Sequence, residues 1–176
     1  MGSCQDCPNK GILVPPDGPV PCPLAFVGEA PGHHEARQGK PFVGPAGIKL
    51  MSLMADIGLE RKEVYITNSV KCLPNPTPHP EAIERCRPML QAELDAVKPI
   101  LIVVLGGVAL QSLLPNTGKT ISAIRGRIIW DGRRLYLPLL HPAAVLHNPG
   151  LAKEMKADFI RIPGALAKAV VMSKRR

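Results

Sequence analysis

The sequence predicts an α/β fold, namely a three-layer α/β/α sandwich with a central, mostly parallel sheet of four strands. Short apolar runs alternate along the chain with longer segments in which apolar residues recur at helical spacing. The chain has 176 residues and 45% of them are hydrophobic, which is enough to bury one core. Neither an internal repeat nor a linker-like stretch divides the sequence, so we expect a single domain over residues 1–176.

The first half of the chain predicts two strands and a helix. An apolar run indicates a strand at 24–29, and a helix follows from about Pro45 to Ile57, where Gly58 ends it. The second strand is expected at 64–70. The loop between the first strand and the helix is far longer than the roughly two to six residues that such a connection needs. We therefore expect this loop to have a role of its own.

The alternation continues with a helix over about 81–97, which has Pro80 in a position suited to its first turn. A third strand at 100–105 precedes a glycine pair and a short helix that ends near Leu114.

The last part of the chain predicts a hairpin and a helix. Two extended runs within 124–140 flank Asp131-Gly132, a dipeptide typical of tight hairpin turns. A final helix is expected over about 150–172, with an interruption near Pro163.

Four loops are expected at the carboxyl ends of the strands, where α/β sheets bind their ligands. The unusual residues of the sequence fall in these loops, which cover 28–44, 68–80, 106–108 and 141–148. This convergence predicts one active site. Two other motifs do not indicate nucleotide sites. The stretch LPNTGKT lacks the first glycine of a P-loop because Leu113 stands there, and Gly106-Gly107 lacks the spacing of a dinucleotide fingerprint.

The charge of the chain favours a polyanionic partner. There are 22 Lys and Arg against 14 Asp and Glu, a net charge of +8, and nucleic acid is the simplest such partner. The N-terminus is polar and no apolar run reaches the roughly 20 residues of a membrane span. We expect no membrane partner and an intracellular protein, in cytoplasm or nucleoid, whose thiols stay reduced.

Four of the five cysteines have a spacing that suggests a metal site. Cys4 and Cys7 form a C-x2-C pair, and Cys72 and Cys86 form a wider one. Such thiolates can bind zinc or an iron–sulfur cluster, and the wide second spacing favours a cluster with a structural role. Alternatively, the cysteines are small buried residues, which suits Cys22 best.

Several motifs together resemble the family 4 uracil-DNA glycosylases, the iron–sulfur members of the uracil-DNA glycosylase superfamily. They are GEAPG at 28–32, GKPFVGPAG at 39–47, Asn68 four residues before Cys72, and HPA at 141–143 followed by LHNP. The resemblance implies a monofunctional hydrolase for base excision repair, which releases uracil from single- or double-stranded DNA and leaves an abasic site. It also implies a monomer with a [4Fe-4S] cluster on Cys4, Cys7, Cys72 and Cys86.

The resemblance also implies a role for each residue of the base pocket. Glu29 would activate the attacking water, and His141 would stabilise the leaving uracil anion at O2. Phe42 would stack on the flipped base and Asn68 would bond its Watson–Crick edge. Glu35 would lie against C5 and exclude thymine.

Other readings of these residues remain open. Phe42 could pack in the core, Asn68 could cap a strand, Glu35 could be an exposed charge, and His141 could be an ordinary turn residue.

A second set of residues is implied to contact substrate and DNA. Ala30 would line the base pocket, while Ala143, Leu146 and Asn148 would approach the minor groove, with Leu146 as a wedge in the base stack. Leu146 could instead pack inward. HPA stands where many relatives have HPS, and the adjacent pair His33-His34 has no assigned role beyond a solvated one.

Two other functions are compatible with the sequence. One is a non-catalytic DNA-binding module stabilised by metal, which the charge and cysteines would also suit. The other is a related glycosylase that prefers another deaminated base, such as hypoxanthine or xanthine.

Overall fold

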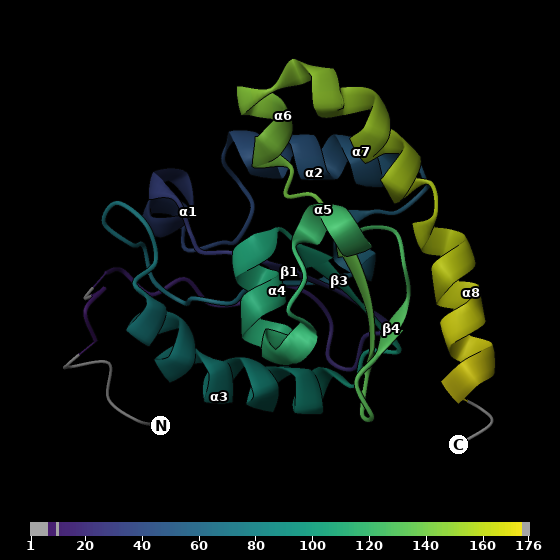
Figure 1. Ribbon diagram of the computed structural model, residues 1–176. Coiled ribbons are helices and arrows are strands. Elements are labelled where there is room, and N and C mark those ends of the chain that lie inside the picture. The colour runs from purple at the N-terminus through teal and green to yellow at the C-terminus, as the bar shows by residue number, and fades with distance from the viewer. Residues whose placement is uncertain (1–6, 10, 174–176) are drawn as a thin grey trace.

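The structure is a computed structural model that describes residues 7–9 and 11–173. Its centre is a five-stranded sheet of order β2-β1-β3-β5-β4 (Figure 1). The strands are β1 (Leu24–Gly28), β2 (Tyr65–Asn68), β3 (Leu101–Leu105), β4 (Ile129–Trp130) and β5 (Leu135–Leu139). All neighbours are parallel except β4 and β5. The predicted α/β class and mostly parallel sheet are confirmed, with five strands rather than four.

Strand β4 is short because the first arm of the predicted hairpin, expected over 124–130, is extended only at its end. Ile124 is the last residue of helix α5 (Ile121–Ile124), and only Ile129 and Trp130 pair with β5. Asp131 closes the turn, since its carboxylate accepts the backbone N–H groups of Arg133 and Arg134, each at 2.7 Å.

Helices follow the strands as predicted, with three differences. The helices are α1 (His33–Gln38), α2 (Pro45–Ala55), α3 (Pro80–Val97), α4 (Gly107–Leu113), α5 (Ile121–Ile124), α6 (Ala143–His147), α7 (Ala152–Phe159) and α8 (Ile162–Ser173). Helix α1 lies inside the predicted loop 28–44, and helix α6 lies inside the predicted loop 141–148. The predicted final helix is two helices, because Pro163 cannot donate a backbone hydrogen bond to a preceding turn but fits the first turn of α8.

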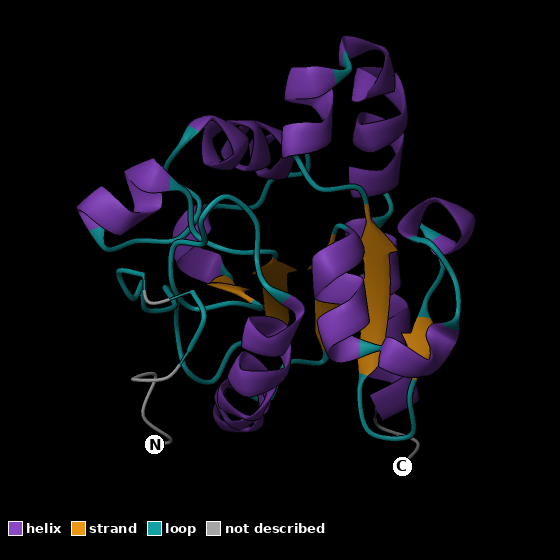
Figure 2. Cartoon of the chain, turned by 60° about the vertical axis from the view of Figure 1, so that its left-hand side comes forward, coloured by secondary structure: helices purple, strands orange, loops and turns teal. Residues whose placement is uncertain are grey.

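Alternate strand residues face two apolar layers, which gives the sandwich. One layer packs α2, α7 and α8 on the face that carries Phe26 and Val103, where Phe26 stacks on Phe159 with ring centroids 6.4 Å apart. The other packs α3, α4 and α5 on the face that carries Val27 and Val104. Figures 1 and 2 show the strands enclosed between these groups of helices. None of the described helices is long and apolar enough to cross a bilayer.

The N-terminal segment runs antiparallel to β2 and to the chain that follows it. Asp17 exchanges two backbone hydrogen bonds with Ile66, of 2.7 and 2.9 Å. Val14 donates to the carbonyl of Lys71 at 2.8 Å, and Leu13 forms a bridge with Cys72. This pairing fixes the N-terminal segment beside the loop after β2.

Candidate active site

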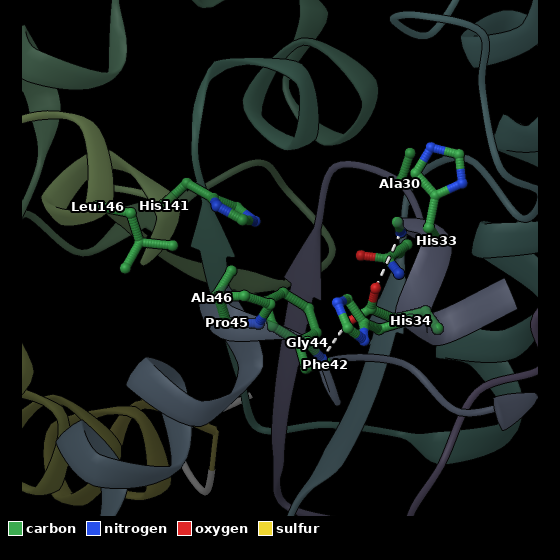
Figure 3. A pocket seen from close by; sticks show the side chains of 12 residues that line it. Ala30, His33, His34, Phe42, Gly44, Pro45, Ala46, His141 and Leu146 are labelled. Carbon is green, nitrogen blue, oxygen red and sulfur yellow. Dashed lines mark hydrogen bonds between the residues drawn. The ribbon is translucent and has the colours of Figure 1, made fainter. Parts of the chain in front are cut away.

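A pocket of about 370 Å³ lies beyond the carboxyl ends of β1, β2 and β5 (Figure 3). It collects six of the residues predicted to contact base or DNA: Ala30, Glu35, Phe42, Asn68, His141 and Leu146. They come from three separate segments of the chain, which meet there because parallel strands end at one edge of the sheet.

The ring of Phe42 forms one wall of this pocket. Its centroid lies 5.6 Å from that of His141, with the planes inclined by 30°. Phe42 is 5% exposed and also contacts the core, so the core and pocket readings both describe it. Gly28 lies beneath the ring, where a Cβ atom would come within 2.5 Å of Phe42 Cζ and 2.6 Å of Asn68 Oδ1. Only glycine leaves both side chains in place.

Asn68 ends β2 opposite Gly28 and is buried. No hydrogen bond joins its side-chain amide to any other described residue. Within the described part of the chain, the Asn68 side chain therefore does not cap the end of the strand. A buried amide that lines a pocket can donate and accept hydrogen bonds with a ligand.

His141 follows β5 and points into the pocket as a neutral imidazole. Burial lowers the pKa of His141 to about 4, although the negative charge of Glu35 acts in the opposite direction. Nδ1 accepts the backbone N–H of Ala143 at 3.2 Å, so the remaining proton is assigned to Nε2. The pocket thus receives an N–H donor without a positive charge.

Glu35 is buried and not an exposed charge, so that alternative is wrong. Its Oε1 accepts the N–H groups of Val43 and Gly44 at 2.9 and 2.7 Å, and Oε2 accepts that of Gly32 at 3.0 Å. Burial by itself would raise the pKa of Glu35, but the hydrogen bonds from Gly44, Val43 and Gly32 hold this pKa below its usual range. Glu35 therefore fastens the start of α1 to the loop that carries Phe42.

Replacing Glu35 by glutamine is expected to lower the free energy of unfolding by about 1–3 kcal/mol, because one amide oxygen cannot serve three donors. The lowered pKa makes this stabilisation complete above the ordinary glutamate pKa of about 4.3. The stabilisation is lost as the pH falls through the lower folded-state pKa. Urea unfolding at pH 7 and at acid pH measures both effects.

The control for Glu35 is Glu63→Gln. The Glu63 carboxylate accepts one backbone N–H, that of Glu60 at 2.8 Å, in an exposed turn. Equal losses of stability in the two variants would contradict the role given to Glu35.

Glu29 lies behind the wall of the pocket. It lines an adjoining cavity of about 720 Å³, which shares Ala30, Gly32 and His33 with the pocket. Burial raises the pKa of Glu29. Its backbone carbonyl accepts the N–H of Val70 at 2.9 Å, which ties this loop to the end of β2.

The segment predicted to approach DNA is helical. Helix α6 carries Leu146, which is 50% exposed at the pocket and so does not pack inward. Asn148 follows α6 and its Oδ1 accepts the N–H of Gly150 at 3.1 Å. His33 and His34, which were predicted to be solvated and have no assigned role, are exposed and line the side of the pocket away from Leu146 (Figure 3).

Three of the predicted metal ligands, Cys7, Cys72 and Cys86, are buried. Cys4 lies outside the described residues. Over 7–9 and 11–173, no three His, Cys, Asp or Glu side chains form a group that could hold a metal ion. Cys22 is buried and its thiol donates to the carbonyls of Leu24 and Glu63 at 3.2 and 3.4 Å, which fits the small buried residue that was predicted.

Comparison with known proteins identifies the family. The model of the uracil DNA glycosylase superfamily matches residues 15–162. A type-4 uracil-DNA glycosylase of Archaeoglobus fulgidus is 41% identical over 172 residues, which cover 91% of this chain and 86% of the relative. That of Sulfurisphaera tokodaii is 40% identical over 91% of this chain and 79% of the relative, and that of Thermotoga maritima 38% over 82% and 79%. This chain belongs to the uracil-DNA glycosylase superfamily and groups with its type-4 members.

Proposed function

We propose that this chain is a monofunctional uracil-DNA glycosylase, which hydrolyses the N-glycosidic bond of deoxyuridine in DNA and leaves an abasic site for base excision repair. One observation carries the proposal above the others. An aromatic ring, an amide with no hydrogen-bond partner among the described residues and a neutral imidazole, from three different segments of the chain, face the same small pocket. This is the set of groups that a flipped pyrimidine requires.

Base recognition is assigned to Phe42 and Asn68. A base inside a duplex cannot be reached, so the deoxyuridine must rotate out into the pocket. Its ring then lies on Phe42, while the Asn68 amide bonds the Watson–Crick edge. Burial makes the Asn68 amide selective among bases. A base that did not hydrogen-bond this amide would leave it buried, desolvated and without a partner, which costs free energy.

His141 is assigned to the leaving group. As the bond between C1′ and N1 breaks, negative charge collects on the uracil ring and its O2. A neutral imidazole that already holds its proton on Nε2 can donate to this oxygen without reorganisation.

Glu29 is assigned to the water that attacks C1′. Its raised pKa suits a carboxylate that must take up a proton as the new C–O bond forms. The adjoining cavity that Glu29 lines could supply this water. Glu35 keeps its proposed place against C5 of the base, in addition to the hydrogen bonds described above.

DNA is the proposed macromolecular partner. The net charge of +8 supports attraction to phosphates, and half-exposed Leu146 on α6 stands at the pocket as the proposed wedge. Ala143 and Asn148 flank that position and are proposed to contact the strand. All these residues come from one chain, so one copy of the chain provides the whole proposed site. We propose that the protein acts as a monomer inside the cell.

We further propose that Cys4, Cys7, Cys72 and Cys86 hold a [4Fe-4S] cluster. Three of the thiols are buried, and the bridge between Leu13 and Cys72 brings the N-terminal segment to the loop after β2. Four cysteine thiolates are the ligands that an iron–sulfur cluster requires. When bound, the cluster would cross-link the N-terminal segment, the loop after β2 and helix α3, which carries Cys86, and would take no part in the hydrolysis.

Replacing Cys72 by serine is expected to remove the iron and to lower the melting temperature by on the order of 10 °C, because the cross-link is lost. Iron and sulfide analysis, visible absorption and calorimetry after anaerobic purification measure this. Cys22→Ser is the matched control and should keep the iron. A colourless wild-type protein with stoichiometric zinc would contradict the cluster.

The activity itself is tested with oligonucleotides that contain one uracil, in U:G, U:A and single-stranded form. We expect strand breaks only after hot alkali, which is the sign of an abasic site made without a lyase step. Parallel substrates with hypoxanthine or xanthine test the alternative specificity. Faster release of either base than of uracil, or no release of any base, would contradict the proposed function.

A further inference from the structure

Arg61, which no motif singles out, makes three directed contacts beneath the pocket loop. It opens the short 3-10 turn Arg61–Glu63 that leads into β2. Its Nη1 donates to the carbonyl of Phe42 at 3.0 Å and its Nη2 to that of Pro41 at 2.7 Å. Its Nε donates to Oδ2 of Asp17 at 2.8 Å. The guanidinium thus engages two successive carbonyls and a carboxylate, an arrangement that its planar fork of donors permits.

The backbone that Arg61 contacts has a strained conformation at Phe42. Phe42 has a φ of 52°, in the left-handed region that residues with a side chain rarely adopt. The carbonyls of Pro41 and Phe42 bond Arg61, and the next two N–H groups, of Val43 and Gly44, bond Glu35. A cation on one side and an anion on the other therefore clamp four successive residues.

Neighbouring groups leave the clamped loop little room to shift. A Cβ atom on Gly47 would lie 2.1 Å from the carbonyl carbon and oxygen of Phe42, so α2 packs directly against this peptide. The Phe42 ring in turn covers Gly28. A change at the Phe42 carbonyl is thus transmitted to the ring that forms the pocket wall.

Asp17 connects this clamp to the strand that carries Asn68. It exchanges two backbone hydrogen bonds with Ile66, two residues before Asn68 in β2. The series Ile66, Asp17, Arg61 and Phe42 is therefore joined by hydrogen bonds throughout. It sets the aromatic wall of the pocket relative to the strand that ends in the base-recognising amide.

We propose that Arg61 is a positioning residue of the glycosylase, which fixes the Phe42 ring against the flipped base by holding the carbonyls of Pro41 and Phe42. The inference rests on the proposed function. Direct binding of DNA phosphate by Arg61 is the competing role. The geometry favours positioning, because the side chain is 27% exposed and all three of its nitrogens already have acceptors.

The test is a double-mutant cycle between Arg61→Gln and Phe42→Ala, with kcat and KM measured on a single-stranded uracil oligonucleotide. Arg61→Gln is expected to lower kcat/KM on the order of 10- to 100-fold, because a stacking ring displaced by about 1 Å loses its alignment. In the Phe42→Ala background the same change should have almost no effect. Binding of free uracil, measured by calorimetry, should weaken in Arg61→Gln in parallel.

Two further variants make the result specific. Arg133→Gln removes an equal charge from the hairpin turn, where Arg133 pairs with Asp95, and should leave kcat/KM near wild type. Arg61→Lys keeps the charge without the fork; it should remain impaired, and it serves as the test variant if Arg61→Gln does not fold.

Equal losses of kcat/KM in the wild-type and Phe42→Ala backgrounds, or an Arg61→Lys protein with wild-type kinetics, would overturn the proposal. If the wild-type chain releases no base at all, the proposed function fails instead, so the two failures are distinguishable.

Discussion

Replacing His141 by alanine is expected to lower kcat for uracil release by about 100- to 1000-fold, the usual effect of removing one donor from a site of developing negative charge. The physical reason is the tautomer. The Ala143 N–H bonds Nδ1, so the proton on Nε2 faces the pocket, and the low pKa keeps the ring neutral at pH 7. Single-turnover kinetics on a uracil oligonucleotide measure the chemical step.

His141→Gln is the matched variant, since its amide can also donate without a charge, and it should keep more activity than His141→Ala.

The low pKa of His141 should also affect the stability of the fold. Because the pKa of His141 falls from its ordinary value of 6.5 to about 4, the folded state binds fewer protons than the unfolded state between these values. The free energy of unfolding of the wild-type protein should therefore decrease as the pH is lowered from about 6.5 to about 4. The decrease should be smaller in His141→Ala and His141→Gln. Wild-type kcat in His141→Ala would refute the assignment.

Replacing Glu29 by glutamine is expected to lower kcat by about 100- to 10,000-fold, the range for loss of a general base. The two side chains have nearly the same size, so the change removes the basic oxygen and little else. The carboxylate must be ionised to accept a proton. The wild-type rate should therefore fall as the pH drops through a pKa that lies above the ordinary glutamate value of about 4.3.

The pH profile of Glu29→Gln separates this role from a structural one. If Glu29 is the base, the acid limb disappears from the residual activity. Asp17→Asn, which alters a carboxylate that contacts Arg61 and lies apart from the proposed water, should keep the limb even if its rate falls. An unchanged acid limb in Glu29→Gln would assign the titration to another group. If Glu29→Gln and His141→Ala both leave every function intact, a non-catalytic DNA-binding module is the better description.

The sequence predicts the layers of this fold well because its apolar periodicity is strong. Strands β1 and β3 and helix α3 lie almost where the pattern places them. Helix α1 is not predictable in this way, since its six residues contain no apolar stripe and Glu35 holds it to a distant loop. The extended run expected before Asp131 is also shorter than predicted, because Ile124 packs in the core as the last residue of α5 and only Ile129 and Trp130 pair with β5.

The motifs name the residues of the site but not how they are held. Phe42 and Asn68 can be picked from the sequence, yet the left-handed backbone of Phe42 leaves no trace in it. Arg61 sits in the charged run ERKE, which is typical of a solvated turn, and the sequence has no signal for its three contacts. Glu29 is recognised by its motif, whereas its place behind the pocket wall depends on how two loops meet.

The pairing of the N-terminal segment with β2 has a consequence for self-association. β2 is one of the two edge strands of the sheet, and an uncovered edge offers unpaired backbone groups to any other chain. Asp17 occupies part of that edge through its pairing with Ile66, and the same segment continues along the chain after β2, where Leu13 pairs with Cys72. The proposed cysteine ligands would hold the segment there. Oxidative loss of such a cluster would then do more than loosen a terminus. It would uncover the edge of the strand that ends in Asn68, and the damaged protein would become prone to aggregate through that strand.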